Sequence, residues 1–324
     1  MYSTFNDYKS YILKDNSIDD FTNELNFNNQ FNEIDNLFII TENILSSLNQ
    51  LYSIKNVINK YGCDKATMYY IDQDEEFSKM LITQSKFTVS SLESLDNTQE
   101  NSKTLIQSLE SNLDKIKTAI KEFFIKIAKF FKEIWNKIIS YFNDDINKLK
   151  RAKTKVEEIK SLNFGDGDRL AIVSRKTLND FLSSIALHSQ MFFKRDFEQL
   201  KKGINDDMHY AVLLNSVQFK VLSLSNEFPD KKALIEVIDK CIKLLQHYTS
   251  QSKVFNQEYL EALQLSNTII DENNREHIDK KVEEFKLKSQ AIGRYIDMMK
   301  RITNIVIQVC DKAIDEEQNK KETQ

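Results

Sequence analysis

The feature that most constrains the fold is a long amphipathic segment in the middle of the chain, NLDKIKTAIKEFFIKIAKFFKEIWNKIISYFNDD, which starts at residue 112. Its large apolar side chains recur at the three- and four-residue spacing of an α-helix, so they share one face, while lysines and glutamates occupy the other. Burying about thirteen such side chains would contribute on the order of 20–40 kcal/mol before ordering entropy is subtracted. A face of this size cannot remain bare in water.

The composition points to helices throughout. Five glycines and one proline in 324 residues supply few of the turns that sandwiches and barrels require. Leu, Ile, Lys, Glu and Gln, in contrast, favour long helices. The sequence therefore predicts an all-α protein with a long amphipathic helix and a C-terminal antiparallel helical bundle, and at most a minor strand or turn near residues 165–173.

Local signals place the expected elements along the chain. A helix over about 34–61 should end at Gly62, which acts as a C-cap. A second basic helix is expected after the amphipathic one, over 144–162. A short strand at 169–173 should follow, with Ser174 as the N-cap of the next helix. Four further helices are then expected over about 175–202, 206–227, 230–270 and 275–317.

Charge is distributed in blocks. Residues 1–111 hold 17 acidic and 8 basic side chains, whereas residues 112–160 hold 13 basic and 7 acidic ones. One interpretation is that each block is simply a solvated surface. The other, which we adopt as a prediction, is a division into an acidic N-terminal helical region that is a candidate propeptide, a basic amphipathic segment and a C-terminal helical bundle, at 1–110, 111–162 and 163–324.

Motifs for catalysis are not recognisable in the sequence. It contains no glycine-rich phosphate loop, no nucleophile elbow and no HExxH or CxxC spacing. The three cysteines, Cys63, Cys241 and Cys310, are far apart and are expected to be reduced. The N-terminus lacks the pattern of a secretory signal peptide. We therefore expect a non-enzymatic protein with no catalytic, cofactor-binding or metal site and no export signal.

Two sets of side chains are candidate binding surfaces. The apolar face of the amphipathic helix could meet a partner or a membrane, or pack inside the protein or its oligomer, and the sequence leaves these uses open. Its central members are Ile120, Phe123, Phe124, Ile127, Phe130, Phe131, Ile134, Trp135 and Ile138. The second set could neutralise DNA phosphates without reading base sequence, and it consists of Lys148, Lys150, Arg151, Lys153 and Lys155.

A short signal is repeated just before the amphipathic helix. The tetrapeptide Ser-Leu-Glu-Ser occurs at 91–94 and again at 108–111, at either end of a polar stretch. The simpler pattern Ser-x-Glu also occurs at 225–227.

The order of these features resembles the internal head or inner-core structural proteins of large tailed bacteriophages. In that group an N-terminal region, glutamate-terminated processing sites, an aromatic and lysine-rich helix, a second charged helix and a helical C-terminal domain follow one another. The resemblance implies that the Ser-Leu-Glu motifs are prohead-protease sites, cut after Glu93 or Glu110. Loss of residues 1–110 would raise the net charge from −4 to about +5.

The resemblance also implies a function and a location. It implies a virion structural protein of the inner head, present in the host cytoplasm during assembly and ejected with the DNA. Its partners would be further copies of itself and other virion proteins, with non-specific DNA contact and transient membrane contact. Two other classes stay open on the residues alone: a helical membrane-active or pore-forming protein, and a cytosolic helical adaptor.

Overall fold

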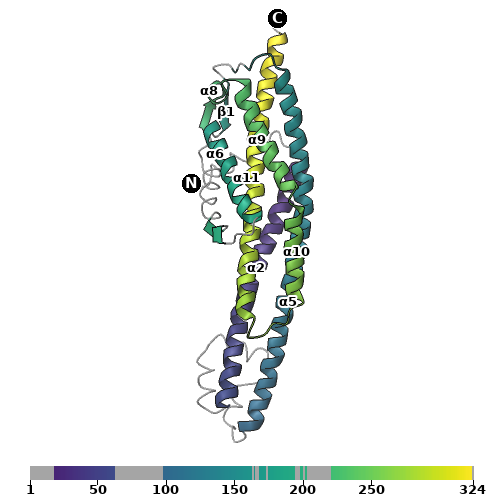
Figure 1. Ribbon diagram of the computed structural model, residues 1–324, viewed down its shortest axis with the longest axis vertical. Coiled ribbons are helices and arrows are strands. Elements are labelled where there is room, and N and C mark those ends of the chain that lie inside the picture. The colour runs from purple at the N-terminus through teal and green to yellow at the C-terminus, as the bar shows by residue number, and fades with distance from the viewer. Residues whose placement is uncertain are drawn as a thin grey trace. The chain divides into compact units, whose positions relative to one another are not determined.

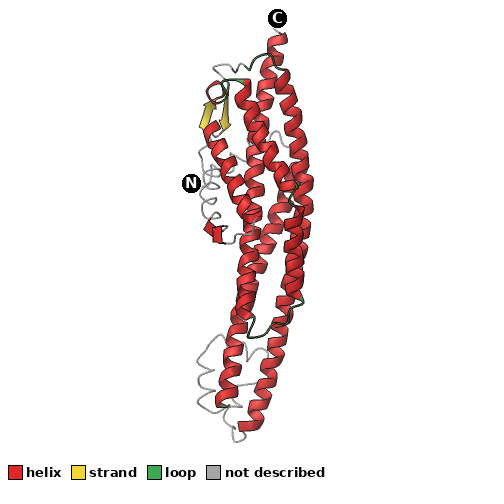
Figure 2. Cartoon of the chain, viewed as in Figure 1, coloured by secondary structure: helices red, strands yellow, loops and turns green. Residues whose placement is uncertain are grey.

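The structure, a computed structural model, describes residues 18–62, 98–162, 164, 168–172, 174–193, 198–199, 201–202 and 220–322. Helices dominate these residues, with two short strands beside them (Figure 2), so the all-α prediction is confirmed. The elements drawn in Figure 1 are α2 (Ile18–Tyr61), α5 (Thr98–Glu158), β1 (Arg169–Ile172), α6 (Arg175–Phe193), β2 (Lys220–Ser223), α8 (Leu224–Glu227), α9 (Lys231–Thr249), α10 (Ser252–Ser266) and α11 (Arg275–Glu322).

The strands form a two-stranded antiparallel sheet. Arg169 of β1 lies opposite Ser223 of β2, and Ile172 lies opposite Lys220. The expected strand at 169–173 is therefore confirmed. The helix expected over 206–227 was wrong at residues 220–223, because a strand needs a hydrogen-bonded partner and tertiary pairing can override a weak local helical preference. Residues 206–219 lie outside the described residues.

Several helix boundaries also differ from expectation, and α5 begins at Thr98 instead of near residue 112. Helix α2 begins at Ile18 instead of near residue 34. Helix α5 runs without a break through residues 142–146, because no Gly or Pro interrupts it and the buried stripe continues at Ile146 and Leu149. The helix expected over 230–270 is instead divided between α9 and α10, where Ser250 donates its backbone N–H to Gln246 and its hydroxyl to His247.

The predicted caps are present. Gly62 adopts a positive φ of 77° and donates its N–H to the carbonyl of Ile58, 2.8 Å away, as a C-cap does. The Ser174 hydroxyl accepts a hydrogen bond from the backbone N–H of Thr177. Asp230 caps α9 in the same way, by accepting from Ala233 N–H at 2.7 Å.

The chain divides into two compact units. The larger unit comprises Met1–Glu33, Lys129–Tyr259 and Glu284–Gln324, and the smaller unit comprises Ile34–Ala128 and Leu260–Glu283. Each unit draws on all three of the regions predicted from charge, and the boundaries of those functional regions remain predictions.

In the larger unit, aromatic side chains of α5 pack against α9, α10 and α11. Trp135 stacks on Phe255 with ring centroids 4.6 Å apart, and Phe131 approaches Phe285 at 5.6 Å. Beside this aromatic layer lies a buried ion pair, in which Lys288 Nζ lies 2.6 Å from Glu258 Oε2. A buried charge without its partner is costly, so this pair favours one register between α10 and α11.

In the smaller unit, α2 and α5 run antiparallel. Phe38 meets Phe123 edge to face at 5.4 Å, and further along α2, Lys55 reaches back to Glu110 at 3.0 Å. The two contacts occur in opposite chain order on the two helices, as antiparallel packing requires.

We expect Phe124→Ala to lower the free energy of unfolding by about 3–5 kcal/mol, because the Phe124 side chain is 0% exposed and its removal leaves a cavity. Ile125→Ala is the matched control on the next residue of α5, where the side chain is 52% exposed, and it should change stability by less than about 0.5 kcal/mol. Denaturant unfolding followed by circular dichroism measures both. Equal losses in the two variants would contradict this assignment of the core face.

Candidate functional site

The predicted apolar face of α5 lies inside the protein. Its aliphatic and phenyl members are each 5% exposed or less: Ile120, Phe123, Phe124, Ile127, Phe130, Phe131, Ile134 and Ile138. Trp135 is partly exposed and stacks on Phe255. These side chains form core in this structure, so meeting a partner or a membrane would require the helices to separate. Within the described ranges, no helix is both long and apolar enough to span a membrane.

The five predicted DNA-contacting cations lie on the last three turns of α5, which we call the basic segment (residues 148–155). Leu149 and Ala152 point inward from this segment and are buried. The cations lie on the opposite side, all exposed apart from the half-buried Lys153. Three of them follow one another at three- and four-residue spacing, which places Lys148, Arg151 and Lys155 along one line of the helix.

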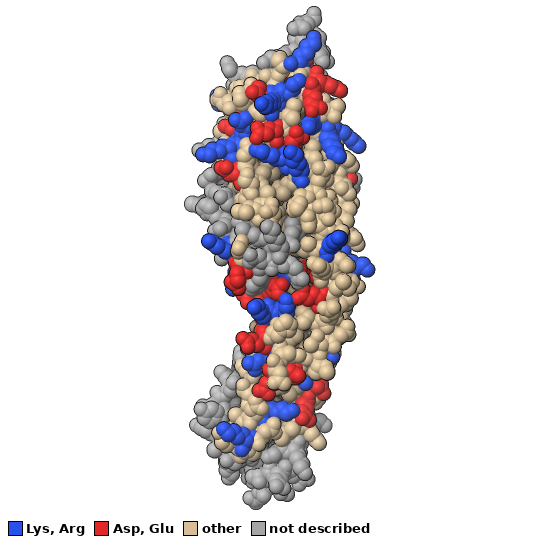
Figure 3. All heavy atoms as spheres, in the orientation of Figure 1, with Lys and Arg blue, Asp and Glu red and all other residues tan. Residues whose placement is uncertain are grey.

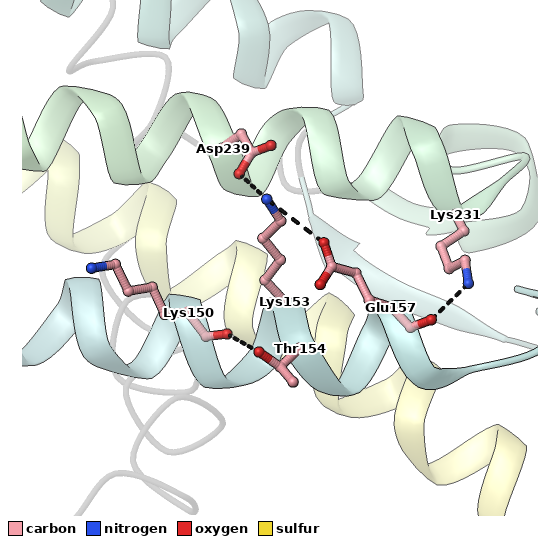
Figure 4. Close-up of polar contacts among 6 residues, drawn as sticks. All are labelled: Lys150, Lys153, Thr154, Glu157, Lys231 and Asp239. Carbon is pink, nitrogen blue, oxygen red and sulfur yellow. Dashed lines mark hydrogen bonds and ion pairs between the residues drawn. The ribbon is translucent and has the colours of Figure 1, made fainter.

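One member of the basic segment is engaged within the protein. Lys153 Nζ lies 2.7 Å from Asp239 of α9 and 3.7 Å from Glu157 of its own helix, as Figure 4 shows. The hydrogen bond with Asp239 raises the pKa of Lys153 above its ordinary value. The ammonium group stays charged, but the carboxylate of Asp239 offsets its attraction for an external phosphate, so Lys153 should contribute less to anion binding than sequence spacing suggests.

Acidic residues of α11 also reduce the positive electrostatic potential around Lys155. Burial raises the pKa of Asp311, the neighbouring Asp315 raises it further, and the positive charge of Lys155 opposes both effects. Lys155 therefore lies close enough to this carboxyl to interact with it.

Lys150 and Arg151 are the cations best placed to meet an external anion. Both are exposed, and among the described residues neither forms an ion pair. Figure 4 shows the Lys150 side chain directed away from the Lys153 contacts, while its backbone carbonyl accepts from Thr154. On the face drawn in Figure 3, basic and acidic side chains are interspersed.

Sequence reasoning missed one lysine at this end of α5. Lys231, from α9, donates a hydrogen bond to the backbone carbonyl of Glu157 at 2.9 Å (Figure 4). It donates another to the backbone carbonyl of Ile159 at 2.8 Å. The last carbonyls of a helix lack partners within the helix and carry partial negative charge, which an ammonium group satisfies. No sequence signal links residues 72 and 74 positions apart, so only the fold reveals this cap.

We expect Lys231→Met to destabilise the protein by about 1–3 kcal/mol, since it removes two hydrogen bonds from a charged donor and keeps most of the apolar stem. Lys232→Met is the matched control, because Lys232 is exposed and caps no helix end in the described structure. Thermal and denaturant unfolding of the two variants provides the comparison. A loss for Lys232→Met as large as for Lys231→Met would overturn the capping role.

The second Ser-Leu-Glu motif lies within folded structure. Residues 108–110 belong to the continuous helix α5, the Leu109 side chain is 0% exposed, and Glu110 pairs with Lys55 of α2. Proteases bind their substrates in extended form, so cleavage after Glu110 would require this part of α5 to unwind or to be cut before it folds. Glu93 lies outside the described residues.

The third Ser-x-Glu match has a structural use. Its glutamate, Glu227 of α8, accepts a 2.7 Å hydrogen bond from the backbone N–H of Arg175, at the start of α6. A carboxylate at a helix N-terminus satisfies a free N–H and complements the helix dipole. This motif is thus accounted for by the fold.

The described thiols are inert. Burial raises the pKa of Cys241 and of Cys310 to about 12, so both remain protonated at neutral pH. Cys63 lies outside the described residues. Across the described part of the chain, no group of His, Cys, Asp and Glu side chains is arranged to hold a metal ion.

Taken together, the geometry defines the class of protein by its fold alone: a mostly helical bundle with an exposed cationic helix end. Comparison with known proteins narrows this class: residues 68–169 match the family of phiKZ-like phage internal head proteins. This match covers both Ser-Leu-Glu motifs, all of α5 and therefore the basic segment, and it confirms the resemblance to internal head proteins of large phages. It indicates a structural role in the virion and a location inside the phage head. No curated protein and no solved structure matches the chain.

Proposed function

We propose that the protein is a non-enzymatic structural component of the inner head of a large phage, proteolytically processed during maturation and ejected with the DNA. The observation that carries this proposal is the match to phage internal head proteins over residues 68–169. It is supported by the mostly helical fold and by the position of both Ser-Leu-Glu motifs inside the matched segment.

Electrostatics supports the proposed processing. Residues 1–110 hold the excess of acidic side chains, and their removal would change the net charge from −4 to about +5. A positive protein associates more readily with packaged DNA because it displaces counterions from the phosphates. Processing would therefore couple maturation to tighter association with the genome.

Within this function, we assign non-specific DNA contact to the exposed members of the basic segment. Lysine presents a point charge with little base-reading geometry, so the contact would follow the phosphate backbone and weaken with salt. Lys150 and Arg151 should contribute most, because Lys153 is held by Asp239 and Lys155 interacts with the nearby carboxyl of Asp311.

Mass spectrometry of purified virions, combined with N-terminal sequencing, tests location and processing together. We expect the protein in intact heads, beginning at Ser94 or Ser111, and its depletion from empty heads after DNA release. Full-length protein in virions would remove the processing proposal and preserve the structural role. Retention in emptied heads would argue against ejection, and absence from virions would overturn the proposed function.

We expect Lys150→Glu/Arg151→Glu to weaken binding to duplex DNA of any sequence and to reduce the slope of log K against log salt by about two. Lys115→Glu/Lys126→Glu is the matched control, because it makes the same change in charge at two exposed positions of α5 outside the basic segment. Fluorescence anisotropy at several salt concentrations measures both. Equal weakening by the two pairs would show that only net charge matters.

A further inference from the structure

In the smaller unit, α2 packs against the apolar face of α5, and Phe38 meets Phe123 edge to face. The apolar side chains that α2 buries in this unit are each 8% exposed or less: Ile34, Phe38, Leu45, Leu48, Leu51, Tyr52 and Ile58. On the α5 side, the face consists of Leu113, Ile120, Phe123, Phe124 and Ile127, each 2% exposed or less. We call these five residues the covered face. The two sets account for most of the large apolar side chains buried in this unit.

The cover is held by apolar contact along its length and by polar contacts near its end. Phe38 packs its ring against Phe123. Near the C-terminal end of α2, Lys55 pairs with Glu110, and Asn56 donates to Glu272 in the loop before α11 at 2.7 Å. The exposed ion pair contributes little, so the cover depends mainly on burial of its apolar side chains.

Both Ser-Leu-Glu motifs lie between α2 and the covered face along the chain. All of α2 precedes Glu93, and the whole covered face follows Glu110. A cut at either Ser-Leu-Glu motif therefore separates the cover from the face it protects. Before the cut, the tether keeps α2 at a high effective concentration beside α5, and afterwards α2 is a separate peptide that dilution can remove.

We propose that α2 is an intramolecular cover for a self-association surface on α5, and that cutting the chain between them frees the covered face to pair with the same face of a second copy. In the virion the cut rests on the processing proposed above. It is a hydrolysis by an endopeptidase, in which one water molecule is consumed, the peptide C–N bond breaks, and a carboxylate and an amino group form.

The chemistry of the covered face favours a second copy as its occupant. It already accepts an apolar helix in antiparallel alignment, with phenyl rings meeting edge to face. Once α2 has left, α5 of another processed copy offers the same kind of face, with the adjacent phenylalanines Phe123 and Phe124 at its centre. Two copies of one face make a closed, twofold interface. Exposed lysines such as Lys115 and Lys126 lie away from that contact.

A full-length variant with a site-specific protease sequence inserted after Glu93 tests the proposal. Analytical ultracentrifugation should find the uncut protein monomeric, and the cut protein dimeric once the N-terminal fragment has been removed. Excess synthetic peptide 18–61 should return the dimer to a one-to-one complex with the peptide. A cut product that stays monomeric after loss of the fragment, or a dimer that the peptide does not affect, would overturn the proposal.

A substitution in the uncut chain tests the same surface independently. Leu48→Glu places a charge at a fully buried position of α2 and should make the uncut protein self-associate, whereas Ile39→Glu, at a position 53% exposed, should leave it monomeric. Adding Phe123→Glu to Leu48→Glu should abolish that association. Association that survives Phe123→Glu would show that another surface is responsible, and circular dichroism checks that each variant is folded.

These experiments also separate the inference from the proposed function. Full-length protein in virions would refute processing, yet the inserted protease site would still report whether α2 covers a pairing surface. Conversely, a processed virion protein whose cut form stays monomeric would sustain the proposed function and refute the cover.

Discussion

Burial of the apolar face of α5 is the interaction on which the rest of the structure depends. This helix supplies core to both compact units, and its side chains from Leu113 to Phe142 meet partners from α2, α9, α10 and α11. Helices of this kind gain most of their stability from packing of an amphipathic face and little from intrinsic propensity. The surrounding helices therefore stabilise the protein chiefly by burying the apolar face of α5.

The sequence predicted the elements whose signals are local. The apolar periodicity predicted the buried face of α5, Gly62 predicted the end of a helix, and Ser174 predicted the start of another. The sequence could not predict β2, because that strand exists through its pairing with β1. The division between α9 and α10 was missed for a related reason: the apolar pattern continues across Ser250, and hydrogen bonds made by that residue end the first helix.

In the candidate DNA site, the sequence likewise predicted which residues are charged but not which partners those charges have. Five cations close together in sequence predicted one basic surface, but their electrostatic roles differ once the helices pack. Asp239 engages Lys153, Asp311 interacts with Lys155, and Lys231 arrives from a distant segment to cap the helix. The partners of a surface charge come from tertiary structure, which no local pattern encodes. The same is true of the buried pair between Lys288 and Glu258.

The position of α2 before both Ser-Leu-Glu motifs connects the packing of α5 with the net charge of the chain. Exposing five large apolar side chains to water costs on the order of 8–15 kcal/mol, which is comparable to the whole stability of a typical domain. A chain that lost α2 could not keep that face bare, so it would have to refold locally or bind another apolar surface. The acidic segment that contains α2 also lowers the net charge while it is attached. One cut would therefore change both what the protein can pack against and how strongly it is attracted to DNA, which links assembly and genome association through a single covalent event.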